Sequence, residues 1–292
     1  MKEIIFHTFE HTFVEVIKLI PFLFLTYLLM EYIEHKTKDK TKNIVKKSGK
    51  AGPFFGALLG VFPQCGFSAA AANLFTARII TMGTLIAVFL STSDEMLPIL
   101  ISKKAPITLI ITILGIKFII GMISGFGIDL ITNVINKKKN SKYEDSKEAI
   151  EHICKHEHCD CEHDGILKSS IKHTLSISLF IFVITYIINI VIHSIGKEVI
   201  EEFIAKVPFV GIIVSALVGL IPNCAGSVII TELFLNNLIS FGSMIAGLLV
   251  GSGIGILVLF KTNKNIKENL KITSLLLVIS IICGFIIDII KF

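Results

Sequence analysis

The residues Pro63-Gln64-Cys65-Gly66-Phe67-Ser68 interrupt a long apolar segment of the chain. A second stretch of the same pattern, Pro222-Asn223-Cys224-Ala225-Gly226-Ser227, follows 159 residues later. Each stretch places an amide, a thiol and a hydroxyl after a proline, which breaks a helix. Broken helices at corresponding positions in the two halves of a membrane protein are typical of a transport site. We therefore interpret the two stretches as parts of one binding site.

The composition around these stretches is that of a membrane protein. The chain has 292 residues, of which 53% are hydrophobic and 17% charged, against about 45–50% and about 25% in soluble domains. Several apolar runs approach or exceed the roughly 18 residues that cross a bilayer as a helix. They are residues 13–30, 79–101, 105–135, 174–192, 238–260 and 272–290. We therefore expect an all-α, polytopic protein of the cell membrane, with the lipid bilayer as a partner.

The lysines predict the orientation of the spans. Residues 35–50 contain seven lysines and one acidic residue, so the positive-inside rule places this loop in the cytoplasm and the N-terminus outside. The same rule places residues 136–170 in the cytoplasm. No small-residue cleavage site follows the first apolar run, which we therefore expect to be a mature helix. Because the lysines flank spans, the net charge of +5 does not indicate nucleic-acid binding.

An internal repeat organises the chain. At an offset of 159 residues, positions 63–101 match positions 222–260 without a gap at 12 of 39 positions, polar residues and glycines included. Duplicated apolar composition, the alternative, does not explain such a match. Each copy has three full spans and one broken-helix hairpin, so the second copy must be inverted. We predict a first membrane repeat over 1–135, a cytoplasmic loop over 136–170 and a second, inverted repeat over 171–292.

The two broken stretches supply the first candidate site residues. A helix that begins at such a break carries partial positive charge at its N-terminus, which suits an anion or a polarised oxygen. The alternative is that serine and asparagine cap the helices and that the cysteines are small core residues. Two symmetry-related copies favour a binding site. The candidates are Gln64, Cys65, Ser68, Asn223, Cys224 and Ser227.

A second candidate cluster is Ser91-Thr92-Ser93-Asp94-Glu95, deep within the apolar run 79–101. Two carboxylates inside a membrane cost several kcal/mol unless they are paired, protonated or exposed to a cavity. They are therefore candidate cation ligands or proton carriers. The alternative is a structural ion pair with Lys117 on the next helix. Pro98 removes a helical hydrogen bond and predicts a kink in this span.

The charged residues of this cluster are not repeated. Asp94 and Glu95 correspond to Gly253 and Ile254, and Lys117 corresponds to Leu276. We therefore expect one assembled site near the midplane of the membrane rather than two. Its predicted acidic members are Asp94, Glu95 and Glu232, and its further polar candidates are Asn73, Ser93 and Ser252.

A dense tract of histidines and cysteines lies in the loop 136–170. Imidazole and thiolate ligands together suit zinc, copper, nickel or a thiophilic metalloid. The spacing matches no standard zinc finger, so we expect a loose metal acceptor. The alternative is a solvated linker with incidental metal affinity. The candidate metal ligands are His152, Cys154, His156, His158, Cys159, Cys161 and His163.

At residues 63–68, 91–95 and 222–224 the sequence resembles a family of ten-helix heavy-metal exporters. Members of this family are also labelled arsenic efflux permeases or manganese transporters. The resemblance covers residues 10–290, and the chain reaches ten helices when each hairpin is counted as two. It implies efflux of a metal ion or metalloid.

These observations predict a secondary transporter that exports a metal ion or metalloid, arsenite-like or divalent such as manganese, in exchange for protons. No Gly-Lys-Ser/Thr motif for nucleotide binding is present, and we expect no cofactor. The alternative is a permease for a small organic solute or anion. A membrane enzyme with Cys65 as nucleophile is disfavoured, because His173 and His193 lie at the ends of their predicted helix. The sequence leaves a homo-oligomer open.

Overall fold

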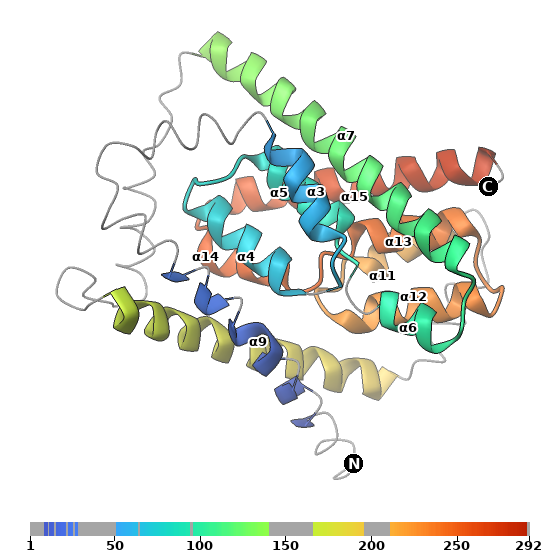
Figure 1. Cartoon of the computed structure of the whole chain (residues 1–292), viewed down its shortest axis with the longest axis horizontal. Helices are drawn as coiled ribbons and strands as arrows, with labels where there is room; N and C mark the ends of the chain where they lie inside the picture. The colour runs from blue at the N-terminus through green and yellow to red at the C-terminus, as the bar shows by residue number, and fades with distance from the viewer. Residues whose placement is uncertain are drawn as a thin grey trace.

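The computed structural model describes residues 9–10, 12–14, 16–21, 23–25, 27–28, 51–63, 65–93, 96–139, 166–195 and 211–290. Within these ranges it is helical and has no strands. The helices are α3 (Gly52–Gly60), α4 (Cys65–Thr76), α5 (Met82–Ser91), α6 (Met96–Ser102), α7 (Ile107–Lys139), α9 (Ile166–Ile195), α11 (Gly211–Gly219), α12 (Cys224–Leu235), α13 (Phe241–Val250), α14 (Gly255–Thr262) and α15 (Ile266–Ile290), as Figure 1 shows. Five candidate spans in the described part are long and apolar enough to cross a membrane. The predicted all-α, polytopic class is therefore confirmed.

The internal repeat extends to the helix boundaries. The first residues of α3, α4, α5, α6 and α7 are each 159 positions before the first residues of α11, α12, α13, α14 and α15. Five successive helices in each half therefore begin at matched positions, which confirms the repeat predicted from the proline and cysteine stretches. The boundaries predicted at residues 135 and 170 stay a prediction.

The segment α3–α4 is a re-entrant hairpin. A Cβ atom built on Gly52 would meet Thr84, whereas one built on Gly60 would meet Ser91, so α3 and α5 run in the same direction. The chain then turns and, after α4, returns to Thr81, the N-cap of α5. Because Thr81 is at the level where α3 begins, both ends of the hairpin lie on one face of the protein.

The second hairpin, α11–α12, opens to the opposite face. Helix α14 runs alongside α4, because its first residue, Gly255, lies against Ser68 and its last residue, Thr262, contacts Thr76 at 2.9 Å between hydroxyl oxygens. The end of α14 is therefore on the face of the first hairpin. Since α13 begins where the second hairpin ends, the span formed by α13 and α14 connects the two faces. This geometry confirms the inverted repeat.

The two repeats exchange partners in the middle of the protein. Helix α4 of the first repeat packs against α14 of the second, and α12 of the second repeat packs against α6 of the first. The first arms of the hairpins stay within their own repeats, where α3 packs on α5 and α7, and α11 packs on α13 and α15. Each hairpin therefore joins its own repeat to the other one.

The two central spans are broken, and the first break differs from our prediction. We expected one helix over 79–101 with a kink at Pro98, but α5 ends at Ser91 and α6 begins at Met96. Pro98 lies in the first turn of α6, where a missing N–H costs no helical hydrogen bond, so it marks a helix start. The span predicted over 238–260 is broken at the matched place, between Val250 and Gly255, where Gly253 has a φ of 53°.

A carboxylate holds the start of each broken span. The Asp129 side chain on α7 accepts hydrogen bonds from the Thr81 hydroxyl at 2.6 Å and from the Gly83 backbone N–H at 2.9 Å. In the second repeat, Asp288 on α15 accepts from Ser240 at 2.6 Å and from the backbone of Gly242 at 2.7 Å. These acceptors satisfy orphan donors at a helix N-terminus. The repeated aspartates are thus structural anchors.

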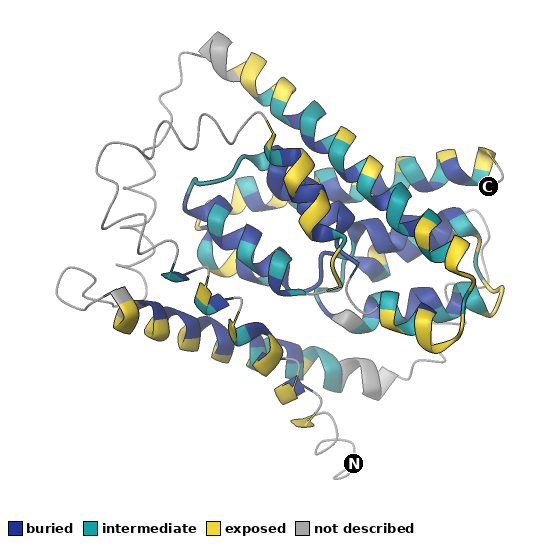
Figure 2. Cartoon of the chain, viewed as in Figure 1, coloured by how far each residue is buried: buried dark blue, intermediate teal, exposed yellow. Residues whose placement is uncertain are grey.

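Burial separates the central spans from the outer helices. Helices α5 and α13 are buried around their whole circumference, whereas α7, α9 and α15 each expose one apolar face (Figure 2). Exposed residues on α7 include Ile111, Ile119 and Ile123, all half exposed or more. An apolar outer face suits lipid, and α7 and α9 lie along opposite edges of the protein (Figure 1).

Candidate functional site

The helix breaks of the two repeats meet at the centre of the protein. A Cβ atom on Gly255, at the start of α14, would lie 2.7 Å from the Phe89 ring of α5 and 2.8 Å from Cβ of Ser68 on α4. Gly251, at the end of α13, lies beside the carbonyl of Gly219, which ends α11. Helices α3, α5, α11 and α13 therefore end, and α4, α12 and α14 begin, in one central layer. We call this layer the crossing.

Lys117 lies in the crossing and bonds both repeats. It projects from α7, is 1% exposed, and donates hydrogen bonds from Nζ to the carbonyl of Thr92 and, at 2.7 Å, to the carbonyl of Leu248. Thr92 caps the end of α5, and Leu248 is in the last turn of α13. The carboxylates predicted to pair with Lys117, Asp94 and Glu95, lie outside the described residues.

The first hairpin turn places a cysteine and a serine at the start of α4. Cys65 is the first residue of α4 and is half-buried, and the buried Ser68 donates from its hydroxyl to the Cys65 carbonyl at 2.8 Å. Ser68 also faces Gly255 of the other repeat. Ser68 therefore lies in the crossing, close to the start of the helix that Cys65 begins. Gln64 lies outside the described residues.

The second hairpin turn is held by a chain of amides. The Asn223 Oδ1 atom accepts from the Ala225 backbone N–H at 3.3 Å and caps α12, as the capping alternative predicts. Its Nδ2 atom donates to Oδ1 of Asn189 at 2.5 Å, and Asn189 in turn donates to Thr12 at 3.0 Å. Asn223 thus ties the turn to α9. The side chain of Cys224 is not described.

Asn189 is a functional candidate that only the structure reveals. It is an amide within the apolar run 174–192, and that isolation was the available signal. A polar side chain in a membrane span normally needs a partner from another helix. Its two partners, Thr12 and Asn223, lie 177 and 34 residues away in sequence. No sequence pattern specifies that pairing.

Among the residues that the structure describes, two predicted site residues have buried polar atoms without a hydrogen-bond partner. The Ser252 hydroxyl, at the break between α13 and α14, is 1% exposed and has no partner in this part of the chain. The Asn73 Nδ2 atom likewise has no partner among the described residues, whereas its Oδ1 atom accepts from the Tyr27 hydroxyl at 3.4 Å. Ser93 is buried and donates to the Ser91 carbonyl at 3.3 Å. Buried donors without partners are rare in native structures, so Ser252 and Asn73 can each take a ligand atom.

Asn73 and Glu232 occupy matched positions on the second arms of the two hairpins. Each lies about two turns along its helix from the break, which is roughly 12 Å at 1.5 Å per residue. Glu232 is half-buried on α12, and Ser227 lies closer to the break on the same helix. Membership of Glu232 in one site with Asp94 and Glu95 stays a prediction.

The described residues contain no cluster that would bind a metal ion. No three His, Cys, Asp or Glu side chains of this part of the chain come close enough to share one. The predicted acceptor tract, His152, Cys154, His156, His158, Cys159, Cys161 and His163, lies outside the described ranges, as do Asp94 and Glu95. Metal binding by these residues stays a prediction.

One histidine is placed differently from our expectation. We predicted that His173 lies at the end of its helix, but α9 begins at Ile166 and His173 is 1% exposed within the span Ser170–Ile190. Its ring stacks on Tyr27 with centroids 5.2 Å apart. The imidazole is thus buried in an aromatic pair, and Tyr27 connects it to Asn73.

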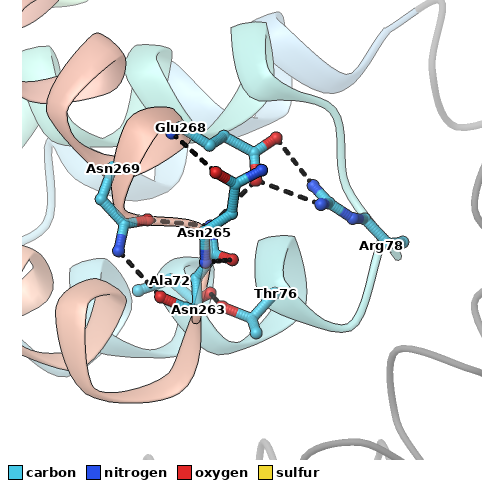
Figure 3. A network of polar contacts seen from close by, with 7 residues as sticks. All are labelled: Ala72, Thr76, Arg78, Asn263, Asn265, Glu268 and Asn269. Carbon is cyan, nitrogen blue, oxygen red and sulfur yellow. Dashed lines mark hydrogen bonds and ion pairs between the residues drawn. The ribbon is translucent and has the colours of Figure 1, made fainter.

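An ion pair joins the repeats on the face where the first hairpin opens. Arg78 donates to both carboxylate oxygens of Glu268, at 2.9 and 3.1 Å, and the Asn263 amide donates to Glu268 at 2.9 Å (Figure 3). Asn263 and Asn269 bond each other, and Arg78 has a φ of 57°. The bonded side chains connect the loop after α4 to the first turn of α15 and to the loop before it. Polar contacts therefore join the two repeats on this face.

We predict a measurable coupling between Arg78 and Glu268. Replacing either residue by alanine should lower the free energy of unfolding, and a double-mutant cycle should give a coupling of about 1 kcal/mol, because the pair is bidentate but 23% exposed on each side. Thermal unfolding of the four proteins in detergent provides the measurement. Lys267→Ala, at an exposed neighbouring lysine, is the control and should be neutral. Additive losses would refute the coupling.

The fold and the crossing define an all-helical membrane protein built from two inverted repeats with broken central spans. A family model described as "Putative, 10TM heavy-metal exporter" matches residues 1–164 and 162–292. The chain therefore belongs to this family of heavy-metal exporters, as the resemblance indicated. Neither a search of curated proteins nor a search of solved structures finds a match.

Proposed function

We propose that the protein is a secondary transporter that exports a metal ion or metalloid in exchange for protons. The observation that carries this proposal is the crossing, where breaks from two inverted repeats meet between hairpins that open to opposite faces. Non-helical backbone inside a membrane is tolerated where protein or a watery cavity surrounds it, and inverted repeats with such breaks bind substrate near the midplane. Membership of a heavy-metal exporter family supports a metal as cargo.

The two hairpins suit alternating access to the crossing. The second arm of each hairpin packs on a half-helix of the other repeat, so a relative movement of the repeats changes the exposure of both turns. In the proposed cycle the face joined by Arg78 and Glu268 opens to load cargo, and the opposite face opens to release it. Asp94 and Glu95 hold the cargo, and protons that enter from outside the cell then protonate the two carboxylates. The histidine and cysteine loop delivers cargo from the cytoplasm.

The proposal is tested by ligand binding and by flux. Purified protein should unfold at higher temperature in the presence of its cargo, because binding to the native state adds stability as ligand concentration exceeds the dissociation constant. The screen compares divalent metals, arsenite and small organic solutes. Vesicles with an imposed proton gradient should then accumulate the stabilising species. Metal or arsenite binding without gradient-driven flux would contradict secondary transport.

We predict that substitution of two cysteines distinguishes a soft cargo, such as arsenite, from a hard one, such as manganese. Thiolates favour arsenite and borderline metals, whereas carboxylates, amides and hydroxyls favour manganese. If the cargo is arsenite-like, Cys65→Ser and Cys224→Ser should each reduce arsenite export severalfold, while Cys283→Ser on α15 should not. If the cargo is manganese-like, all three substitutions should leave export nearly unchanged. Flux in vesicles with both species distinguishes the outcomes.

A permease for a small organic anion is the second candidate function. It is favoured by the N-termini of α4 and α12, which begin at the hairpin turns and carry partial positive charge. This function predicts that a chain lacking residues 140–165 transports normally and that metals do not change the unfolding temperature. Stabilisation by an organic anion but not by metals or arsenite would favour it. We infer no catalytic activity for either function.

A further inference from the structure

Two helices, one from each repeat, end at the crossing, and their C-termini face the same side chain, that of Lys117. Helix α5 ends at Ser91 and α13 at Val250, and their caps, Thr92 and Gly251, have non-helical ψ angles of 127° and 85°. The last four carbonyls of a helix have no partner within it, and the C-terminus carries partial negative charge. In the middle of a membrane, water does not readily supply the missing donors.

The Lys117 ammonium supplies donors to both helix ends. Its bonds reach the carbonyl of Thr92 in the first repeat and that of Leu248 in the second, so one positive charge serves two negative helix ends. The matched position in the second repeat is Leu276, which is fully buried and apolar. The repeat therefore preserves the packing of this position but not its charge. One lysine suffices because the two breaks meet at one place.

A lysine at this depth is costly unless its charge is used. Burying an ammonium is unfavourable when hydrogen bonds and opposite charges do not compensate it, and a leucine at the matched position shows that an apolar side chain fits the fold. Unwound, carbonyl-lined segments of broken spans elsewhere bind small cations. Lys117 places a cation among such carbonyls while keeping it covalently attached to α7.

We propose that Lys117 is a positioning residue whose tethered ammonium occupies a cation site formed by the carbonyls of α5 and α13. It holds the broken spans of the two repeats together at the crossing, and it fixes one positive charge beside the transport site. The first part rests on hydrogen bonds alone, whereas its consequence for export rests on the proposed function. Removing the side chain leaves a site that a small primary ammonium ion can enter.

The test is chemical rescue of Lys117→Ala. The purified variant should unfold about 5–10 °C below the wild-type protein, because two buried carbonyls lose their donor. Propylammonium, present from solubilisation onward, should restore several degrees in a saturable manner, because it reproduces the missing atoms beyond Cβ. Choline, which is cationic but has no N–H donor, should not restore stability. Neither amine should change the wild-type protein.

Leu276→Ala is the matched control, because it creates a cavity at the repeat-related position without the two carbonyl partners. Equal effects of propylammonium on Leu276→Ala and Lys117→Ala, or no effect on either, would overturn the proposal. If Lys117→Ala does not fold, Lys117→Arg should be more stable than Lys117→Met and should retain more export. A methionine variant as stable as the arginine variant would also overturn it.

These readouts separate the inference from the proposed function. Rescue by propylammonium uses no cargo and no proton gradient, so it can succeed in a protein that binds neither metal nor arsenite. That outcome would refute metal export while leaving the role of Lys117 intact. If cargo binds but propylammonium does not rescue Lys117→Ala, the role of Lys117 is refuted and the proposed function is left intact.

Discussion

Replacing Gly125 by alanine is expected to lower the free energy of unfolding by about 2–4 kcal/mol, as overpacking of a tight interface does. The new Cβ atom would lie 2.6 Å from the Gly83 carbonyl oxygen, 2.8 Å from Cβ of Pro53 and 2.9 Å from Cβ of Ala87. All three neighbours are buried parts of α3 and α5 that cannot rotate away. The substitution therefore separates α7 from the broken span that carries the crossing.

Gly127→Ala is the matched control on the same helix. A Cβ atom at Gly127 would meet nothing within 4 Å, so this variant should be neutral or slightly stabilising through its higher helix propensity. Gly284→Ala tests the other repeat, where the new atom would lie 2.8 Å from the Gly242 carbonyl, and it should be as harmful as Gly125→Ala. Thermal unfolding in detergent measures all three. Equal stability of Gly125→Ala and Gly127→Ala would show that helix contact is not tight here.

Neutralising Asp94 and Glu95 together is expected to reduce proton-driven export by roughly tenfold or more, because intramembrane carboxylates normally bind or carry the transported ion. The sequence places both residues between α5 and α6, in the first of the two breaks. The corresponding positions of the other break are Gly253 and Ile254, which cannot replace their charge. Flux in vesicles should be measured for Asp94→Asn, Glu95→Gln and the double variant.

Glu10→Gln is the control for this experiment. It also removes a carboxylate, but an exposed one outside the breaks and the hairpins, so export should persist. Cargo binding and flux should be compared in each variant. Loss of binding would assign the carboxylates to the cargo, whereas loss of proton dependence with binding intact would assign them to coupling. Unchanged proton-coupled export in the double variant would refute both roles.

The sequence predicted the architecture because backbone constraints have visible residue signatures. Pro63 and Pro222 mark the hairpin turns, and Asp129 and Asp288 recur at the same offset because each anchors the N-terminus of a broken span. Three full spans and one hairpin in each copy indicated an inverted repeat. The structure places Lys261, at the end of α14, on the face where residue 51 begins the first hairpin, which agrees with the prediction from the lysines that both lie on one side of the membrane.

The position of the breaks was harder to predict, because a proline in an apolar run is compatible with two structures. Pro98 is compatible with a kink inside a helix or with the first turn of a new one, and the non-helical backbone of residues 92–93 before α6 decides between them. The second break lacks a proline and depends on Gly253, whose φ of 53° a bulky residue would resist.

The partners of residues that act across the repeats could not all be identified from the sequence. The alternative of an ion pair between Lys117 and Asp94 or Glu95 stays a prediction, and the described bonds of Lys117 go to backbone carbonyls, which carry no sequence signal. Asn189 lies in an apolar run and gains its importance from Thr12 and Asn223. Such pairings depend on how distant helices approach in three dimensions. The local pattern around each residue therefore shows that it is unusual but does not identify its partners.

The exchange of half-helices between the repeats has a consequence for biogenesis. The first hairpin arm, α4, packs on α14, and Thr76 and Thr262 are 186 residues apart in the chain. At a synthesis rate of about 5–20 residues per second, the ribosome needs roughly 10–40 seconds to bridge that interval. During this time the second arm of the first hairpin, α4, lacks α14 as its packing partner. Its maturation in the membrane must therefore wait for the second half to be translated and inserted.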